Sequence, residues 1–311
     1  IREGILKKTA FRSGGRLFYW CALIVPLICF AAFYVYVNLN SILLAFQNYW
    51  YDGDRVVTEP AGFKNFEALF RELAKDGMWW VYLRNSLIYV GLLLFVIIPV
   101  SLLFAYYIYK KHLLHGLFKV MVFAPSIICM MVLVIFYHEF VSYALDAVFK
   151  PTKPYMTTTK NTLAFRILFY VATGFSSNLL IYLNAMSQVP QSTVEAAKID
   201  GAGELRTFLS VIIPSIWGTV VSMIVIAMAA IGSEQGNLHA FFGVDPKTRY
   251  AYKPLQTIGF YVFTGVLDSG GNLSRSLFPK ISALGLIITV IVTPLTILCR
   301  ELLTRFGYKE D

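Results

Sequence analysis

Charged side chains are scarce in this 311-residue sequence. They make up 14% of it, against about a quarter in typical soluble domains, while hydrophobic residues make up 57% and the mean hydropathy is +0.63. So little charge excludes an ordinary soluble protein, because such a protein needs more charged groups to hydrate its surface. The net charge of +9 comes from basic residues that lie mostly between apolar runs and form no stripe interleaved with aromatic residues. We therefore expect no nucleic-acid partner.

Residues for ATP binding, catalysis and metal ligation are also lacking. No Gly-x-x-x-x-Gly-Lys-Ser/Thr loop occurs, so the chain should not bind ATP itself. The histidines show no HExxH or paired-carboxylate spacing, which argues against a membrane-embedded enzyme: His112, His115, His138 and His239. The cysteines lie far apart inside apolar runs, and we interpret them as small buried hydrophobes: Cys21, Cys29, Cys129 and Cys299. We expect no catalytic residue, metal or cofactor in this chain.

Six apolar runs dominate what is present. Each is long enough, at 1.5 Å per residue, to cross a hydrocarbon core of about 30 Å as a helix, and continuous runs exclude a β-barrel. The runs are 17–39, 86–109, 117–140, 163–186, 212–232 and 281–299. The first is too long for the core of a signal peptide and lacks a small-residue cleavage site. The sequence predicts an all-α integral membrane protein with about six transmembrane helices.

The distribution of basic residues predicts the orientation. Lys and Arg are nearly equal in number on the two sides, but the positive-inside rule gives most weight to short segments beside the spans. The densest cluster is Arg2, Lys7, Lys8, Arg12 and Arg16, which predicts a cytoplasmic basic segment over 1–16 and an N-in, C-in topology. Segments 40–85 and 233–280 would then face outside. We interpret the amphipathic stretch 65–75 as a helix on the membrane surface or capping the bundle, the alternative being a docking surface.

Ionisable residues are almost absent from the predicted spans. Lys119, Glu139 and Arg166 fall near span ends, where a charge can snorkel to the headgroups. This disfavours proton-coupled transporters and voltage sensors, and it favours an uncharged substrate. Polar residues nearer mid-membrane are candidates for a path that takes a neutral, hydroxyl-rich solute: Thr173, Ser177, Asn178, Tyr182 and Ser222. The alternative is that such groups hydrogen-bond neighbouring helices.

The connection between the fourth and fifth runs is the most distinctive segment. Pro190 stops the preceding helix, and Ser192 or Thr193 can cap a new one. Asp200-Gly201 then supplies a turn, because glycine tolerates a positive φ at a helix end. The pattern predicts a short amphipathic helix, a turn and a second helix on the cytoplasmic face. Such a helix suits mechanical coupling to a soluble subunit, although an ordinary interfacial helix is the alternative.

This connection, about 187–214, resembles the EAA motif in permease (transmembrane) subunits of binding-protein-dependent type I ABC importers. The motif is Glu-Ala-Ala, three residues, Gly, nine residues, an aliphatic, one residue, an aliphatic and Pro. Every spacing is matched here, by Glu195, Ala196, Ala197, Gly201, Val211, Ile213 and Pro214. Asp200 and Phe208 also fit the pattern.

Two further elements are similar to sugar permeases of the maltose and glycerol-phosphate type. Ala61-Gly62-Phe63-Lys64-Asn65-Phe66 lies outside the first span as their Val-Gly-Leu-Asp-Asn-Phe element does, and Asn85-Ser86 opens the second span in a comparable way. The family's Thr-x-Gly-Gly-Pro signature is missing, since residues 232–237 are Gly-Ser-Glu-Gln-Gly-Asn. This departure concerns substrate identity more than architecture.

The resemblance implies the pore subunit of an ABC importer, with a single transmembrane permease domain over 17–311 in a prokaryotic cell membrane. Its implied partners are a second, non-identical permease, two ATP-binding-cassette ATPase subunits that bind ATP and Mg, an extracellular solute-binding protein and membrane lipid. A carbohydrate or oligosaccharide is the implied substrate. By analogy Glu195 would make a charged contact with an ATPase subunit, Ala196 and Ala197 would allow close approach, and Gly201 would permit the turn. The alternative is an ATP-independent secondary transporter or facilitator for a small polar solute.

Overall fold

The computed structural model describes residues 13–52, 55–149, 159–242, 253–270 and 277–307. These residues belong to two compact units, Ile1–Leu69 with Ser269–Leu286, and Phe70–Asp268 with Ile287–Asp311. Most of the basic cluster predicted over 1–16 lies outside the described residues. The single-domain prediction stays a prediction.

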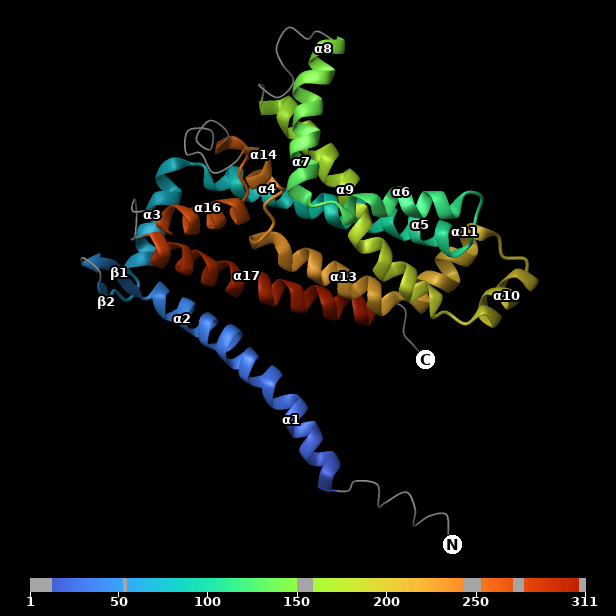
Figure 1. The fold of residues 1–311 in the computed structure, drawn as a ribbon, viewed down its shortest axis with the longest axis horizontal. Helices are drawn as coiled ribbons and strands as arrows, with labels where there is room; N and C mark the ends of the chain where they lie inside the picture. The colour runs from blue at the N-terminus through green and yellow to red at the C-terminus, as the bar shows by residue number, and fades with distance from the viewer. Residues whose placement is uncertain (1–12, 53–54, 150–158, 243–252, 271–276, 308–311) are drawn as a thin grey trace. The chain divides into compact units, whose positions relative to one another are not determined.

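Helices dominate the described residues, as the labels of Figure 1 show. The N-terminal elements are α1 (Ser13–Phe30), α2 (Tyr36–Ala45), β1 (Gln47–Asp52), β2 (Arg55–Pro60), α3 (Lys64–Asp76), α4 (Trp79–Leu92), α5 (Ile98–Tyr109), α6 (His115–Ile127), α7 (Met130–Glu139) and α8 (Asp146–Phe149). The C-terminal elements are α9 (Thr159–Ser187), α10 (Gln191–Ile199), α11 (Glu204–Thr207), α12 (Ile213–Ser215), α13 (Trp217–Ala229), α14 (Leu238–Phe242), α16 (Ile258–Gly270) and α17 (Leu277–Phe306).

The apolar helices match the six predicted runs. Four are long enough to span a membrane alone: Phe18–Ala45, Trp79–Tyr109, Asn161–Ser187 and Leu277–Arg305. Two bent pairs pass the same test together: His115–Ile127 with Met130–Ala144, and Glu204–Ser215 with Trp217–Gly232. Counting each pair as one span gives six among the described residues, so the all-α membrane class is confirmed. The N-in, C-in orientation stays a prediction.

The prolines inside five of the apolar runs suggest kinked helices, and two of these spans, the third and the fifth, are sharply bent. The third bends by 99° between α6 and α7, and the fifth by 75° between α12 and α13. Pro125 lies just before the first break and Pro214 just before the second. A proline cannot donate its backbone hydrogen bond, and its ring crowds the carbonyl one turn earlier, so helices kink or break near it. Pro26 and Pro294, by contrast, lie inside continuous helices.

A β-hairpin interrupts the helices of the first unit, which the all-α prediction did not foresee. β1 and β2 pair antiparallel from Gln47 opposite Pro60 to Asp52 opposite Arg55. The buried Asn65 Nδ2 donates to the backbone oxygens of Ala45 (3.0 Å) and Gln47 (2.9 Å). The Ala61–Phe66 element therefore ties the end of α2 and the base of the hairpin to the start of α3.

The core of the second unit lies along α5 and α9, which pack side by side (Figure 1). Leu102 and Ala105 of α5, Leu179 of α9 and Ile212 of the fifth span are buried together in this core. Another cluster includes Phe260 of α16. Because α16 is apolar and partly buried, the prediction of a polar external segment over 233–280 is wrong for this helix.

The cysteines are not the buried residues that we predicted. Cys21, Cys29 and Cys129 are exposed on the chain, Cys299 is half-buried, and all four are free thiols. Their apolar neighbours are exposed as well, because these helix faces pack against nothing in the described chain. In a bilayer such faces meet lipid or other chains, so an apolar run does not by itself imply burial within one subunit.

Candidate functional site: the coupling segment

The connection between α9 and α13 forms the predicted helix, turn and second helix, and we call residues 187–214 the coupling segment. α10 begins at Gln191, directly after Pro190, whose backbone is extended (φ −57°, ψ 130°). No side chain caps the start of this helix, so the capping role predicted for Ser192 or Thr193 is wrong. The proline itself sets the start, because its fixed φ and missing N–H suit the boundary of a helix.

Gly201 ends α10 in a left-handed conformation. Its φ is +77°, its N–H donates to the Lys198 oxygen (3.0 Å), and the Ala202 N–H donates to the Ala197 oxygen (2.9 Å). This pair of bonds is a Schellman motif, which satisfies the last carbonyls of a helix and needs a residue that tolerates positive φ. No atom lies within 4 Å of the position that a Cβ would occupy. Backbone conformation rather than space therefore requires glycine here.

The coupling segment has one buried face and one exposed face. Val194 is 2% exposed and Phe208 5%, and both belong to the α5–α9 core. Glu195, Ala196, Lys198 and Asp200 are exposed, and Ala197 is half-buried. Ile199 is 86% exposed. Glu195 makes no hydrogen bond or ion pair within the described residues. This face of α10 is therefore left uncovered by the rest of the described chain.

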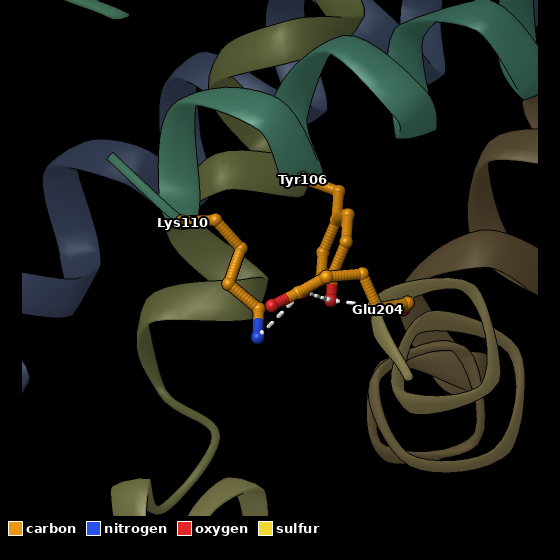
Figure 2. Close-up of polar contacts among 3 residues, drawn as sticks. All are labelled: Tyr106, Lys110 and Glu204. Carbon is orange, nitrogen blue, oxygen red and sulfur yellow. Dashed lines mark hydrogen bonds and ion pairs between the residues drawn. The ribbon is translucent and has the colours of Figure 1, made fainter. Parts of the chain in front are cut away.

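A three-residue cluster fastens the coupling segment to the end of the second span (Figure 2). The Tyr106 hydroxyl donates to Glu204 Oε2 at 2.7 Å and lies 3.1 Å from the Glu204 backbone oxygen. Lys110 Nζ lies 2.9 Å from the same Oε2, with 9% of the lysine side chain exposed against 53% of the glutamate. Charge-assisted bonds of this length are stronger than neutral ones. Glu204 thus attaches the start of α11 to the last turn of α5.

The same contacts fix which connections share a side of the membrane. The Tyr106 ring also packs on Phe208, with centroids 4.8 Å apart. The short connection after α5 and the coupling segment therefore lie at one end of the second unit, as a topology with an even number of crossings between them requires. The sequence did not reveal this cluster, because Tyr106 and Glu204 are 98 positions apart and neither lies in an unusual local pattern.

The candidate substrate-path residues do not form a polar cluster. Thr173 and Ser222 donate to backbone oxygens of their own helices, Phe169 (2.8 Å) and Gly218 (2.8 Å) respectively. Asn178 is half-buried, and the side chain of Ser177 lies outside the described ones. Tyr182 is fully buried, and its hydroxyl has no hydrogen-bond partner among the described residues. No hydrogen bond joins any two of these side chains in the part of the chain that the structure describes.

Arg166 is buried instead of snorkelling, contrary to our prediction. Its side chain is 0% exposed, and Nη2 donates to the Tyr89 hydroxyl (2.7 Å) and approaches the Gly236 oxygen (3.4 Å). Its guanidinium carbon lies 5.8 Å from the centre of the Tyr89 ring and 5.9 Å from that of Phe241. Guanidinium over aromatic faces is a stabilising arrangement when desolvated. A lone arginine near a span end gave no signal that aromatic partners from other segments would enclose it.

Further polar contacts extend from Arg166 along the segment after the fifth span. Glu234 accepts from the Tyr170 hydroxyl (3.1 Å) and the Gly236 N–H (2.8 Å). We call Tyr89, Arg166, Tyr170, Glu234 and Gly236 the polar clasp. Beside it, Asn85 donates to the oxygens of Pro254 and Gln256, and Ser86 accepts from the Ile258 N–H. The Asn85-Ser86 pair thus holds the chain ahead of α16 against the second span.

These observations place the chain in the class of multi-pass membrane proteins, with an exposed helix held at one end of the bundle. The family model for the "Binding-protein-dependent transport system inner membrane component" matches residues 97–305. The chain belongs to this family and is a permease subunit of a type I ABC importer.

Named relatives and solved structures agree with the family. The chain is 26% identical over 305 residues to the polygalacturonan/rhamnogalacturonan transport system permease protein YteP of Bacillus subtilis, covering 93% of this chain and 88% of the relative. It is 25% identical to the lactose transport system permease protein LacF of Rhizobium radiobacter, covering 93% and 95%. A bacterial alginate ABC transporter, solved in complex with its alginate pentasaccharide-bound periplasmic protein, matches in fold with a TM-score of 0.71 at 17% identity, over 98% of this chain and 100% of that chain.

Proposed function

We propose that this chain forms half of the pore of an importer for a carbohydrate or oligosaccharide. The relatives named for a polygalacturonan, a multiple-sugar and a lactose transport system support the substrate class, and they span about nine-tenths of this chain. An extracellular solute-binding protein would deliver the solute, as one accompanies the alginate transporter. The other half of the pore would be a second, non-identical permease.

Two ATPase subunits would drive this pore through the coupling segment. The observation that carries the proposal is the exposed face of α10, where Glu195 and Lys198 flank Ile199 without partners in the described chain. Ala196 and Ala197 add little bulk, so another subunit can approach the helix backbone closely. Gly201 and Pro214 fix where the two helices end and bend. ATP and Mg would bind in the ATPase subunits.

The polar residues of α9 and α13 remain our proposed substrate path. Thr173 and Ser222 already use their hydroxyl protons within their own helices, so their oxygens are left to accept from a solute hydroxyl. Asn178, with a half-buried amide, can both donate and accept. Tyr182 and Ser177 complete the proposed path.

Uptake into vesicles tests this function. The complete importer, reconstituted with its binding protein, should accumulate a labelled oligosaccharide only with ATP present, and should lose accumulation when the binding protein is omitted. Equal accumulation by this chain alone, driven by a solute gradient without ATP, would instead support a secondary transporter. A panel of neutral and uronate oligosaccharides of different lengths would define the solute.

A further inference from the structure

The short connection between the second and third spans has an unusual backbone. Residues 110–114 join α5 to α6, and two of them, Lys111 (φ 53°) and Leu114 (φ 60°), have left-handed backbones without being glycine. Residues other than Gly, Asn and Asp rarely adopt this region of backbone conformation. A bulky residue found there is strained, and contacts with its surroundings hold it in that conformation. Local bonds maintain it here: the Lys111 N–H donates to the Ile108 oxygen (3.0 Å), and the Tyr107 hydroxyl donates to the Leu113 oxygen.

The strained turn presents two leucines outward. Leu113 is 83% exposed and Leu114 65%. Both neighbouring helices belong to membrane spans, and only five residues connect them. The connection must therefore lie at the bilayer surface, whichever way the protein is oriented. Apolar side chains at that depth lower their free energy by leaving water and entering the boundary between headgroups and acyl chains.

The unpaired charges near these leucines in the sequence are all positive. Lys111 and Lys119 are exposed, and the sequence from Ala105 to His138 contains no acidic residue. Lys110 is already paired with Glu204, so it does not add to the free positive charge. Two free lysines beside two exposed leucines complement an anionic lipid surface, which attracts basic residues close to it.

We propose that residues 111–119 bind anionic phospholipid, with Leu113 and Leu114 inserted at the acyl boundary and Lys111 and Lys119 at the headgroup phosphates. Through Lys110 and Glu204 this lipid contact lies one ion pair away from the coupling segment. Lipid binding here would hold the end of α5 in place while ATPase subunits act on α10. The inference depends on the membrane placement of the chain and on none of the substrate assignments.

A spin label at position 113 tests where this side chain lies. The four native cysteines are replaced by serine, Leu113→Cys is labelled, and the complete importer is reconstituted in bilayers containing phosphatidylglycerol. Oxygen, which concentrates in lipid, and a water-soluble nickel chelate are the two relaxation agents. We expect the label to resemble one at Val120→Cys, an exposed apolar position within the third span, with high oxygen and low nickel accessibility.

Two results at position 113 would overturn the proposal. Nickel accessibility equal to that of a label at Lys64→Cys, an exposed position on α3, would place the leucine in water. Protection from both agents would show that a partner subunit covers the turn, which would make it a protein contact.

The lysines are tested by changing the lipid charge. Replacing phosphatidylglycerol by phosphatidylcholine should shift the label at position 113 toward nickel accessibility. Lys111→Gln combined with Lys119→Gln should abolish that shift, whereas Lys64→Gln should leave it intact. A shift of unchanged size in the double variant would refute the headgroup contact. Both lysines are exposed, so the variants should assemble normally, and an unchanged gel-filtration elution volume of the purified importer would show this.

Discussion

Glu204 is the single residue that does most to hold the coupling segment in place, because one carboxylate oxygen meets both Tyr106 and Lys110. Glu204→Ala should lower the free energy of unfolding by about 1–3 kcal/mol, because it leaves the almost fully buried Lys110 ammonium without a carboxylate partner. Lys110→Met should cost less, because Glu204 is half-exposed and water can solvate it. In a double-mutant cycle, followed by thermal unfolding of the purified importer, Glu204→Ala should cost less in the Lys110→Met background. Losses that simply add would show that the two residues are not coupled.

Gly201 is the second residue whose identity the geometry requires. Gly201→Ser should destabilise the turn by about 1–3 kcal/mol, because serine would have to adopt φ +77°. Gly203→Ser is the matched control: Gly203 has φ −68° and precedes α11, where serine is a good N-cap. The ratio of uptake to ATP hydrolysis should fall in the first variant and stay normal in the second. Equal behaviour of the two variants would contradict the role of the left-handed turn.

Among the structural elements, the polar clasp is packed too closely at Gly236 to accept added volume. A Cβ on Gly236 would lie 2.5 Å from the Tyr89 ring, and the residue has φ +58°. Gly236→Ala should therefore cost at least about 1–3 kcal/mol through overpacking. Gly91→Ala, on the same span as Tyr89, has no neighbour within 4 Å of its Cβ and should be neutral or slightly stabilising. Thermal unfolding of both variants tests this prediction. An unchanged midpoint temperature of unfolding in Gly236→Ala would contradict the close packing around Gly236.

The sequence pattern predicted the helices better than it predicted the contacts between them. Apolar length located all six spans, and the spacing from Glu195 to Pro214 located the coupling segment. The prolines indicated kinked helices but not which spans would bend sharply, since Pro125 and Pro214 lie beside sharp bends whereas Pro294 leaves its helix continuous. Contacts such as Tyr106 with Glu204 were missed because tertiary packing joins residues from separate spans. In the sequence, the Asn85-Ser86 pair stood out only by its resemblance to sugar permeases. Its hydrogen bonds to the chain before α16 give a physical reason for these two residues at this position.

At the scale of the whole molecule, the proposed function requires an apolar helix bundle that is driven by ATPase subunits outside the chain. The family establishes a permease subunit, and the exposed face of α10 gives that subunit a surface on which ATPase subunits can act. A bundle with two broken spans and a fastened coupling segment has parts that can move as units. In the proposed importer, ATP binding to the ATPase subunits would shift the population of this bundle between inward-open and outward-open arrangements.

Parallel measurement of ATP hydrolysis and solute uptake in a Glu195→Lys importer tests this account most directly. Reversing the charge on the exposed face of α10 should leave the subunits assembled and ATP hydrolysis present, but should reduce uptake by about tenfold, as a loss of about 1.4 kcal/mol at the interface would. Glu301→Lys makes the same charge reversal at an exposed position near the end of α17 and should leave both activities normal. Uptake at the unmodified level in Glu195→Lys would contradict coupling through this segment.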